Sequence, residues 1–468
     1  ASATLAAPAA HPKARPNAIT AAVASSASCQ AGGAAWSTSD AISAAARTKA
    51  KAMRVQRSIV RRSYGVVARG TLTCAPAGRA DPRRGVAGVG STVVRRALDD
   101  PAARRLLIAA AFGLFALGAA QAGYGPAFPA LMERFGVGLD RVGEVVVAHF
   151  AGALTATFAT SAALPILGYR RVLVGAATVA TAGLTLVAFA PAWGWLLAGA
   201  GLAGVGFGFL NTAYNVLVAR VFSPDSAPVL NLLSAVFGLG AVAVPAAIAG
   251  LGTLQAPFLA LAAATAVSGV LAPGVPVPGA LPAGRGRSTP WAAALGFALL
   301  YAVYVGTESS VASWETVHLE GTYGTRTAAL LTSAFWATLT IGRLIAIPIA
   351  HRVRPRDLVL ASSAVSLLLL IATHATPLAP FAYVAVGLTF APVFPTTLAW
   401  IERVFPARSE RIVPFALGAA GFGPMIATAV IGRWADASGP SVVPTALSAL
   451  GGLLLVVVAA MWWITRRD

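Results

Sequence analysis

The chain has 468 residues, of which 57% are hydrophobic and only 11% are charged. A soluble domain of average composition carries about 25% charged residues, so the composition excludes that class. Apolar runs of about 20 residues recur, which is the length needed to cross the hydrocarbon core of a bilayer. We therefore expect an all-α polytopic membrane protein whose main partner is the lipid bilayer.

The net charge of +19 is unevenly distributed along the chain. Residues 1–100 hold 15 Lys and Arg against 4 acidic residues, and the other residues hold 20 against 12, mostly in short loops. A nucleic-acid-binding protein concentrates its basic residues on a folded surface instead. The distribution therefore argues against nucleic acid as a partner.

Residues 1–98 are rich in Ala, Ser, Arg and Gly, and the first acidic residue is Asp40. They contain no apolar run of secretory type, and residues 47–63 fit a basic amphipathic helix. This composition is typical of an organelle transit peptide. We predict import into a plastid, to the envelope or thylakoid membrane, with the mitochondrial inner membrane as the first alternative and a native basic cytosolic tail as the second.

Twelve apolar spans follow this disordered basic segment. We expect a six-helix bundle in residues 99–272, a Pro/Gly/Arg-rich central loop in 273–290 and a second six-helix bundle in 291–468. The expected spans lie near 105–131, 142–163, 170–190, 193–220, 228–250, 255–272, 291–318, 326–350, 357–374, 379–401, 409–433 and 441–465.

The arginines test this count, because loops on the inner side of a membrane protein are enriched in Lys and Arg. Alternate loops and the two flanks of the span region hold 15 arginines, whereas the opposite loops hold only Arg134, Arg141, Arg326 and Arg433. This asymmetry favours twelve spans with both ends on the inner side.

The two halves resemble each other at an offset of 183 residues. Arg220-Val221-Phe222 recurs as 403–405, and the pair Gly238 and Gly240 recurs as Gly421 and Gly423. A direct repeat of six spans relates the halves by a pseudo-twofold axis along the membrane normal. Transporters built this way bind solute near mid-membrane, between the halves.

Four stretches carry a resemblance to a known family: 206–222, 237–245, 304–314 and 333–352. From about residue 105 onward the chain is similar to the major facilitator superfamily, and these stretches are closest to its fucose:proton symporter-like branch. Sugar symporters of that branch carry a carboxylate in helix 4, where this chain has Asn211. The loop signature between helices 2 and 3 is also degenerate here, at 164–171. The resemblance implies transport by alternating access, and these departures place proton coupling elsewhere than in helix 4.

Two carboxylates, Glu308 and Glu315, lie seven residues apart on one face of the seventh span. Ionisable residues inside a membrane helix are costly and mark transport or proton pathways by default. Glu308 is about 20 Å from the inner edge of its span, too deep to reach the interface. We therefore predict that Glu308 carries the coupling proton; the alternative is a structural hydrogen bond or ion pair. Glu315 is a further candidate, although its place near the outer end favours a solvated interface.

His149 is deep in the second span and is a third candidate for proton coupling. The alternative is a neutral, hydrogen-bonded histidine inside the bundle.

Amide, phenol and indole side chains are the candidates for solute binding, because they suit hydroxyl-rich ligands. The alternatives are interhelical hydrogen bonds and anchoring at the membrane interface. The candidates are Gln121, Tyr124, Asn211, Tyr214, Asn215, Tyr304, Trp314, Trp336 and Trp400.

Structural or gating roles are expected for two arginines and four glycines. Arg343 is expected to bind helix ends near the inner side. The set is Arg171, Arg343, Gly238, Gly240, Gly421 and Gly423. No metal-ligand spacing and no nucleophile–base arrangement is present in the sequence, so we expect neither an enzyme nor a cofactor.

The sequence thus predicts a monomeric secondary transporter of a small polar solute, a sugar or related metabolite, with protons as the coupling ion. Two alternatives stay open. One is an uncoupled facilitator or exporter of an organic metabolite, and the other is a transport-inactive membrane receptor or scaffold.

Overall fold

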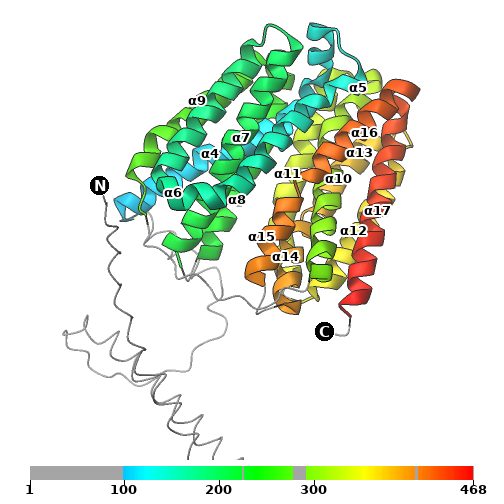
Figure 1. Cartoon of the computed structure of the whole chain (residues 1–468). Helices are drawn as coiled ribbons and strands as arrows, with labels where there is room; N and C mark the ends of the chain where they lie inside the picture. Colours follow the sequence, from blue (N-terminus) through cyan, green and yellow to red (C-terminus); the bar gives the residue numbers. More distant parts are fainter. Residues whose placement is uncertain (1–98, 224–225, 278–290, 351, 406–408, 467–468) are drawn as a thin grey trace, which may run out of the picture. The chain divides into compact units, whose positions relative to one another are not determined.

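The computed structural model describes residues 99–223, 226–277, 291–350, 352–405 and 409–466. The predicted transit peptide and most of the predicted central loop lie outside these ranges. The described residues form helices and no strands (Figure 1). In the N-terminal half the helices are α4 (Pro101–Phe135), α5 (Leu139–Val142), α6 (Glu144–Phe189), α7 (Trp193–Val221), α8 (Ser226–Leu251), α9 (Gln255–Leu271) and the short η1 (Ala272–Gly274). In the C-terminal half they are α10 (Trp291–Tyr323), α11 (Thr325–Ala350), α12 (Pro355–Ala372), α13 (Ala379–Phe390), α14 (Val393–Val404), α15 (Ser409–Ala419), α16 (Phe422–Ser438), η2 (Pro440–Val442) and α17 (Val443–Ile464).

The described residues hold eleven stretches that are long and apolar enough to cross a membrane. One of them, residues 139–189, is 51 residues long, far more than the roughly 20 residues that one crossing needs. It is interrupted at Gly168, whose φ of 75° and ψ of 159° are not helical. It therefore holds two spans, which gives the twelve-helix arrangement predicted from the sequence.

Three spans contain or adjoin a break in the helix. Spans 2 and 3 are joined by a kink at Gly168, with helix on both sides of that residue. Two other spans are each split into two helices, at 391–392 between α13 and α14 and at 420–421 between α15 and α16. The first break coincides with Pro392 and Pro395, which supply no backbone N–H for the helical ladder.

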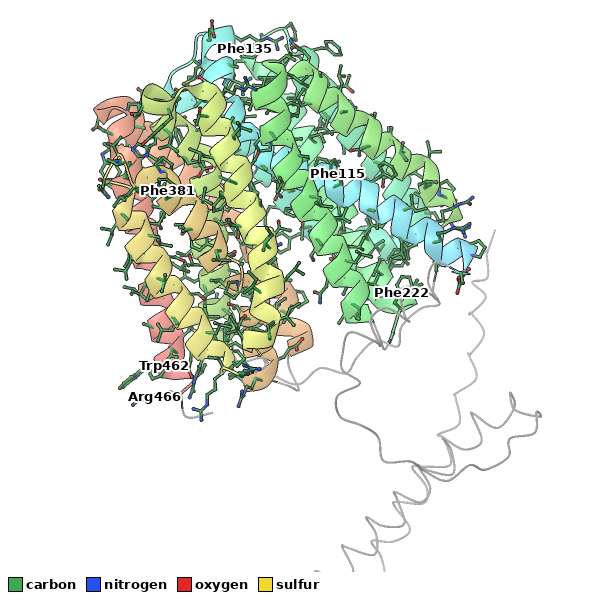
Figure 2. The ribbon with its side chains drawn as sticks, turned by 180° about the vertical axis from the view of Figure 1, so that it is seen from behind. Phe115, Phe135, Phe222, Phe381, Trp462 and Arg466 are labelled. Carbon is green, nitrogen blue, oxygen red and sulfur yellow. The ribbon has the colours of Figure 1, made fainter. Side chains whose placement is uncertain are left out.

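The first span illustrates how local sequence sets a helix end. Asp100 caps α4 by accepting a hydrogen bond from the Ala102 amide at 3.0 Å, and Pro101 occupies the first helical position. Gly136 ends the helix in the left-handed conformation, with φ of 62°. Figure 2 places Phe135, at this end of α4, opposite the end that holds Phe222 and Arg466. The arginine asymmetry predicts that the Phe135 end is the outer end.

Large apolar side chains lie on the outside of these helices as well as inside. Val270 is 78% exposed and Phe381 is 75% exposed, and many other Leu, Ile and Val residues share this setting. A soluble protein does not expose so many apolar side chains, whereas a bilayer solvates them. The chain is a multi-pass integral membrane protein.

Candidate functional site

A cavity of about 130 Å³ lies between the two halves. Its polar lining comes from the N-terminal half: Gln121 of α4, Thr157 of α6 and Asn211 of α7. The C-terminal half contributes Leu417 and Gly418 of α15, together with Gly421. The site predicted between the bundles is therefore present as a space that both halves line.

A second cavity of about 80 Å³ shares Asn211 with the first. Asn215 of α7, Ser234 of α8 and Arg343 of α11 supply the rest of its polar lining. The two cavities thus meet at Asn211 and form one polar region, which we call the central site.

The two asparagines of the central site are held together. The Asn215 side-chain amide donates to the Asn211 backbone carbonyl at 2.8 Å and to the Asn211 side-chain oxygen at 2.9 Å. Both residues are exposed to the cavity space. This fixes the orientation of both amides and leaves the Asn211 NH₂ and the Asn215 carbonyl directed away from their mutual bonds. Such fixed donors and acceptors suit hydroxyl and carbonyl groups of a solute.

Glu308 and Arg343 lie within electrostatic range of each other. Glu308 of α10 is only 9% exposed, and it lies beside the Tyr304 hydroxyl and in electrostatic range of the Arg343 guanidinium. Among the described residues no carboxylate lies within 4.0 Å of Arg343, and its Nε is buried without a hydrogen-bond partner. The pair is therefore close but not joined, so a solute or a proton can change its interaction energy.

Tyr304 is held at the break between α13 and α14. Its hydroxyl donates to the Phe390 carbonyl at 3.2 Å, and the Tyr301 hydroxyl donates to the Phe394 carbonyl at 2.9 Å. Backbone groups that a broken helix frees at membrane depth need such partners. These bonds give Tyr304 a packing role and set its ring beside Glu308.

His149 lies in the N-terminal half rather than in the cavity lining. It is fully buried, its Nδ1 is 3.2 Å from the Tyr124 hydroxyl, and its Nε2 has no partner among the described residues. Phe150 and Phe207 surround the ring. This apolar setting favours the neutral imidazole, the structural alternative considered for this residue.

The solvated setting expected for Glu315 is wrong. Glu315 is 0% exposed, and neither of its carboxylate oxygens has a hydrogen-bond partner among the described residues. It lies on the side of α10 that packs on α11 and α13, where Thr332 and Tyr383 are its polar neighbours.

Three tryptophans and one tyrosine lie away from the central site. Trp314 packs on Phe128 and Trp400 on Phe297, each with ring centroids 5.3 Å apart. Trp336 packs behind the cavity residue Phe237, at 6.4 Å.

Tyr214 is also buried, and its hydroxyl is 2.8 Å from Ser268 Oγ inside the N-terminal half. The structure thus brings Gln121, Asn211 and Asn215 to the cavities and leaves these four aromatic residues in the packing of the helices.

The four predicted glycines lie where helices approach closely. A Cβ on Gly240 would be 2.1 Å from the Phe115 carbonyl oxygen, and one on Gly423 would be 1.8 Å from that of Ala302. Both contacts fall within one half. Gly238 and Gly421 instead face the opposite half, where the added Cβ would meet Thr340 at 2.3 Å and Leu154 at 3.2 Å.

Repeat positions therefore serve equivalent contacts in the two halves. Arg343, which was expected to bind helix ends, lines the central site, and its expected structural role stays a prediction. Arg171 is exposed on the inner side.

The outer ends of the two halves are packed together. A Cβ on Gly125 would be 2.3 Å from the Ala312 carbonyl oxygen, and one on Gly432 would be 2.7 Å from that of Leu139. Phe128 and Trp314 meet at the same level. Over its whole length, α7 has its main contacts with α4, α6 and α8 of its own half. This packing closes the central site at that end, as in the inward-facing conformation of an alternating-access transporter.

Ser234 and Leu417 line the cavities but are absent from the sequence-based candidates. They occupy corresponding positions of the repeat, 183 residues apart. Aligning the two halves at the offset of 183 residues and comparing the positions that face the cavity would identify both residues.

These features define a class of protein: a polytopic membrane protein with twelve spans, two halves and a polar cavity between them. Residues 110–318 match the family model described as "Major Facilitator Superfamily". This match covers less than half of the chain, and the arrangement of the helices is the major facilitator fold.

Two curated relatives share part of the sequence. The chain is 32% identical over 111 residues to major facilitator superfamily domain-containing protein 4A of Xenopus tropicalis, which covers 23% of this chain and 22% of that protein. It is 29% identical over 120 residues to the protein of the same name from Mus musculus, covering 25% and 23%. The matched segment therefore spans less than a quarter of the length of these relatives.

Solved transporter structures share the fold at low sequence identity. The nucleoside transporter NupG has a TM-score of 0.65 at 13% identity, covering 76% of this chain and 99% of that one. A D-xylose-proton symporter has a TM-score of 0.64 at 12% identity, covering 77% and 97%. The E. coli fucose:proton symporter FucP has a TM-score of 0.55 at 16% identity, covering 76% and 98%. FucP is one of several structural neighbours, so these structures show the fold, and the branch stays a prediction.

Proposed function

We propose that the chain is a secondary active transporter that moves a small polar solute by alternating access. The observation that carries this proposal is the central site, a polar space lined by both halves and closed at the outer end. Rocking of one half against the other would expose the same residues to the outer side.

We infer that the solute is a sugar or a related metabolite. The cavity lining offers two fixed amides, a glutamine and two hydroxyl side chains, which are groups that bind hydroxyls and carbonyls through directional hydrogen bonds. The small cavity volumes favour a small solute. The xylose and fucose symporters and the nucleoside transporter among the structural neighbours are consistent with this class.

Coupling to protons is assigned to Glu308. An ionised carboxylate at this depth is costly unless it is paired, and Arg343 is the cation in range. A proton on Glu308 cancels its attraction to Arg343 and frees the guanidinium to bind solute. Loss of the proton on the inner side restores the attraction and favours release of the solute. In this scheme Arg343 links the proton to the solute.

Uptake into proteoliposomes of the purified full chain tests the proposal. A panel of labelled sugars and organic acids is offered with and without an inward proton gradient. We expect gradient-driven accumulation of one solute, which Glu308→Gln abolishes while exchange of that solute is partly retained. Unaltered pH dependence in this variant would remove Glu308 from the coupling step.

Two other outcomes identify the alternatives. Equilibration without accumulation indicates an uncoupled facilitator or exporter. Saturable binding without flux of any solute indicates a receptor or scaffold. The quantity that separates the three is the ratio of internal to external solute at steady state.

We also propose that residues 1–98 direct the protein to the plastid envelope or thylakoid membrane, and that it acts there as a monomer. Their basic, acid-poor composition supports import. Fusion of residues 1–98 to a fluorescent protein tests this localisation. Mitochondrial fluorescence would select the first alternative, and cytosolic fluorescence would select a native basic tail.

A further inference from the structure

Glu315 is a buried carboxylate that the proposed transport cycle does not use. It is 0% exposed, whereas Glu308 on the same helix is 9% exposed. Neither Glu315 oxygen has a hydrogen-bond partner among the described residues. No arginine or lysine lies within 4.0 Å of it in the described part of the chain. An ionised carboxylate in such a setting lacks both solvation and a counter-charge, so the neutral acid is the stable form.

The polar neighbours of Glu315 come from two helices packed on α10. The Thr332 hydroxyl of α11 lies alongside, but it is engaged with Thr316 Oγ1 at 3.1 Å. Tyr383 of α13 is fully buried and in electrostatic range of Glu315. Its hydroxyl is 2.9 Å from His318 Nδ1. Glu315 is thus in electrostatic range of a tyrosine that is already hydrogen-bonded to a histidine.

The histidine bonded to Tyr383, His318, lies near the outer end of α10. His318 is partly exposed, and it lies in electrostatic range of His374 in the segment between α12 and α13. His374 is exposed, and its Nε2 is 3.2 Å from Thr445 Oγ1. Glu320, five residues beyond Glu315 on α10, is the other acidic residue at this end of the helix. Titratable groups therefore succeed one another from the exposed outer end to the buried carboxylate.

We propose that Glu315 is a second proton-binding site, loaded from the outer side through His374, His318 and Tyr383. The inference rests on the proposed transporter function for its role in the cycle, but binding of the proton at Glu315 does not require the solute. It also differs from the coupling assigned to Glu308, whose neighbours are Tyr304 and Arg343.

The loading step conserves protons and charge. Protonated His318 gives its Nδ1 proton to the Tyr383 oxygen, and the Tyr383 hydroxyl gives its own proton to the Glu315 carboxylate after that carboxyl group rotates. The products are a neutral histidine, an intact tyrosine and a neutral carboxylic acid. Each group is a known donor or acceptor for the proton that it handles.

The distance to Glu308 keeps this site separate in the inward-facing conformation. Seven residues of helix correspond to about 10 Å along the axis, which is too far for direct transfer between the two acids. The outer ends of the halves are closed to solute, whereas transfer of a proton between neighbouring side chains needs no open cavity. Glu315 therefore holds a proton without leaking it to the central site.

Infrared difference spectroscopy of the purified full chain between acidic and alkaline pH tests the proposal. A protonated carboxylic acid gives a C=O stretching band, separate from the bands of carboxylates, that shifts in D₂O. We expect one such band to disappear in Glu315→Gln and to return in Glu315→Asp. Tyr383→Phe should leave the band but slow its appearance after a pH jump on the outer side. Glu320→Gln is the matched control and should leave the Glu315 band in place.

A band unchanged by Glu315→Gln would overturn the proposal. Loss of the band in Glu315→Gln with an unchanged rate in Tyr383→Phe would overturn the route through Tyr383. The elution volume of each variant in gel filtration confirms that it is folded. The outcome is independent of the uptake experiment, because the band is measured without solute. Retention of the band in Glu308→Gln, alongside a failure of that variant to change uptake, would count against Glu308 and leave Glu315 in place.

Discussion

Residues of one type have different surroundings in this protein, and the difference decides what each one does. Trp314 and Trp400 are both buried against an aromatic ring, but only the Trp400 indole has a partner: it donates to Thr465 Oγ1 at 3.1 Å. The Trp314 Nε1 has no partner among the described residues. The composition of the two spans gives no sign of this difference. It follows from the faces of the helices that meet, which one chain's sequence does not specify.

Replacement of each tryptophan by phenylalanine separates the hydrogen bond from the packing. Both variants lose similar side-chain volume, so the free-energy costs of the two cavities largely cancel when the variants are compared. Trp400→Phe also loses a hydrogen bond and leaves the Thr465 hydroxyl short of a partner, which costs about 1 kcal/mol more than Trp314→Phe. Thermal unfolding in one detergent measures the difference. Equal loss of stability in the two variants would contradict the assigned bond.

Asn215 and Tyr214 are neighbours on α7 with opposite surroundings. Asn215 holds Asn211 in the central site, whereas Tyr214 bonds Ser268 in the interior of the N-terminal half.

We expect Asn215→Ala to raise the KM for the transported solute about tenfold, since a loss of about 1.4 kcal/mol of binding corresponds to that factor. Tyr214→Phe is the control. It should lower stability by about 1 kcal/mol and leave KM unchanged, because its hydroxyl does not reach the cavities. Uptake kinetics and thermal unfolding of both variants check the contrast, and an equal change in KM would place Tyr214 in the site.

At the scale of the elements, the sequence predicts the number and order of spans because hydropathy depends on composition alone. It does not predict how each span is interrupted. Pro126, Pro129 and Pro245 lie inside α4 and α8, which continue through them, whereas the chain between α13 and α14 breaks near Pro395. The outcome depends on whether neighbouring helices supply partners for the freed backbone groups, as Tyr301 and Tyr304 do. Such partners come from distant parts of the chain.

The candidate site could be predicted only in part, because the sequence does not show how distant helices pack on one another. The polar face of α7, with Asn211 and Asn215, is readable from a spacing of four residues. The position of Arg343 in the cavity and the burial of Glu315 depend on how α11 and α13 pack on α10.

Close packing of α16 on α10 gives a prediction at this scale. A Cβ on Gly423 would overlap the Ala302 carbonyl, so Gly423→Ala forces the helices apart and should cost about 1–3 kcal/mol. Gly452 of α17 has no neighbouring atom within 4 Å of the added carbon. Gly452→Ala is therefore the matched control, and it should stabilise slightly through helix propensity. Opposite shifts of the unfolding temperature would confirm the contact, whereas equal shifts would contradict it.

At the scale of the whole molecule, the outer closure depends on small residues between the halves. Gly125, Gly143 and Gly432 let the halves meet around Trp314, so the inward-facing conformation requires that these positions have no side chain.

We therefore expect Gly125→Val to favour the outward-facing conformation. The test uses chains in which Cys29 and Cys74 are replaced by serine and Ser313, buried at the closure, is replaced by cysteine. A membrane-impermeant thiol reagent added on the outer side should label this cysteine several-fold faster when Gly125→Val is present. Gly175→Val, where the added carbon meets no neighbouring atom within 4 Å, is the control. The same labelling rate in both variants would contradict the assigned closure.

Gly238 and Gly240 differ by two residues on α8, yet the first faces the opposite half and the second faces its own. Gly421 and Gly423 repeat this division in the C-terminal half. In the proposed transport cycle, the boundary between the moving and the fixed contacts would therefore run along α8 and along the start of α16, not through the spaces between helices. Each of these two segments is packed against its own half on one side. Its other side forms the surface against which the opposite half would turn.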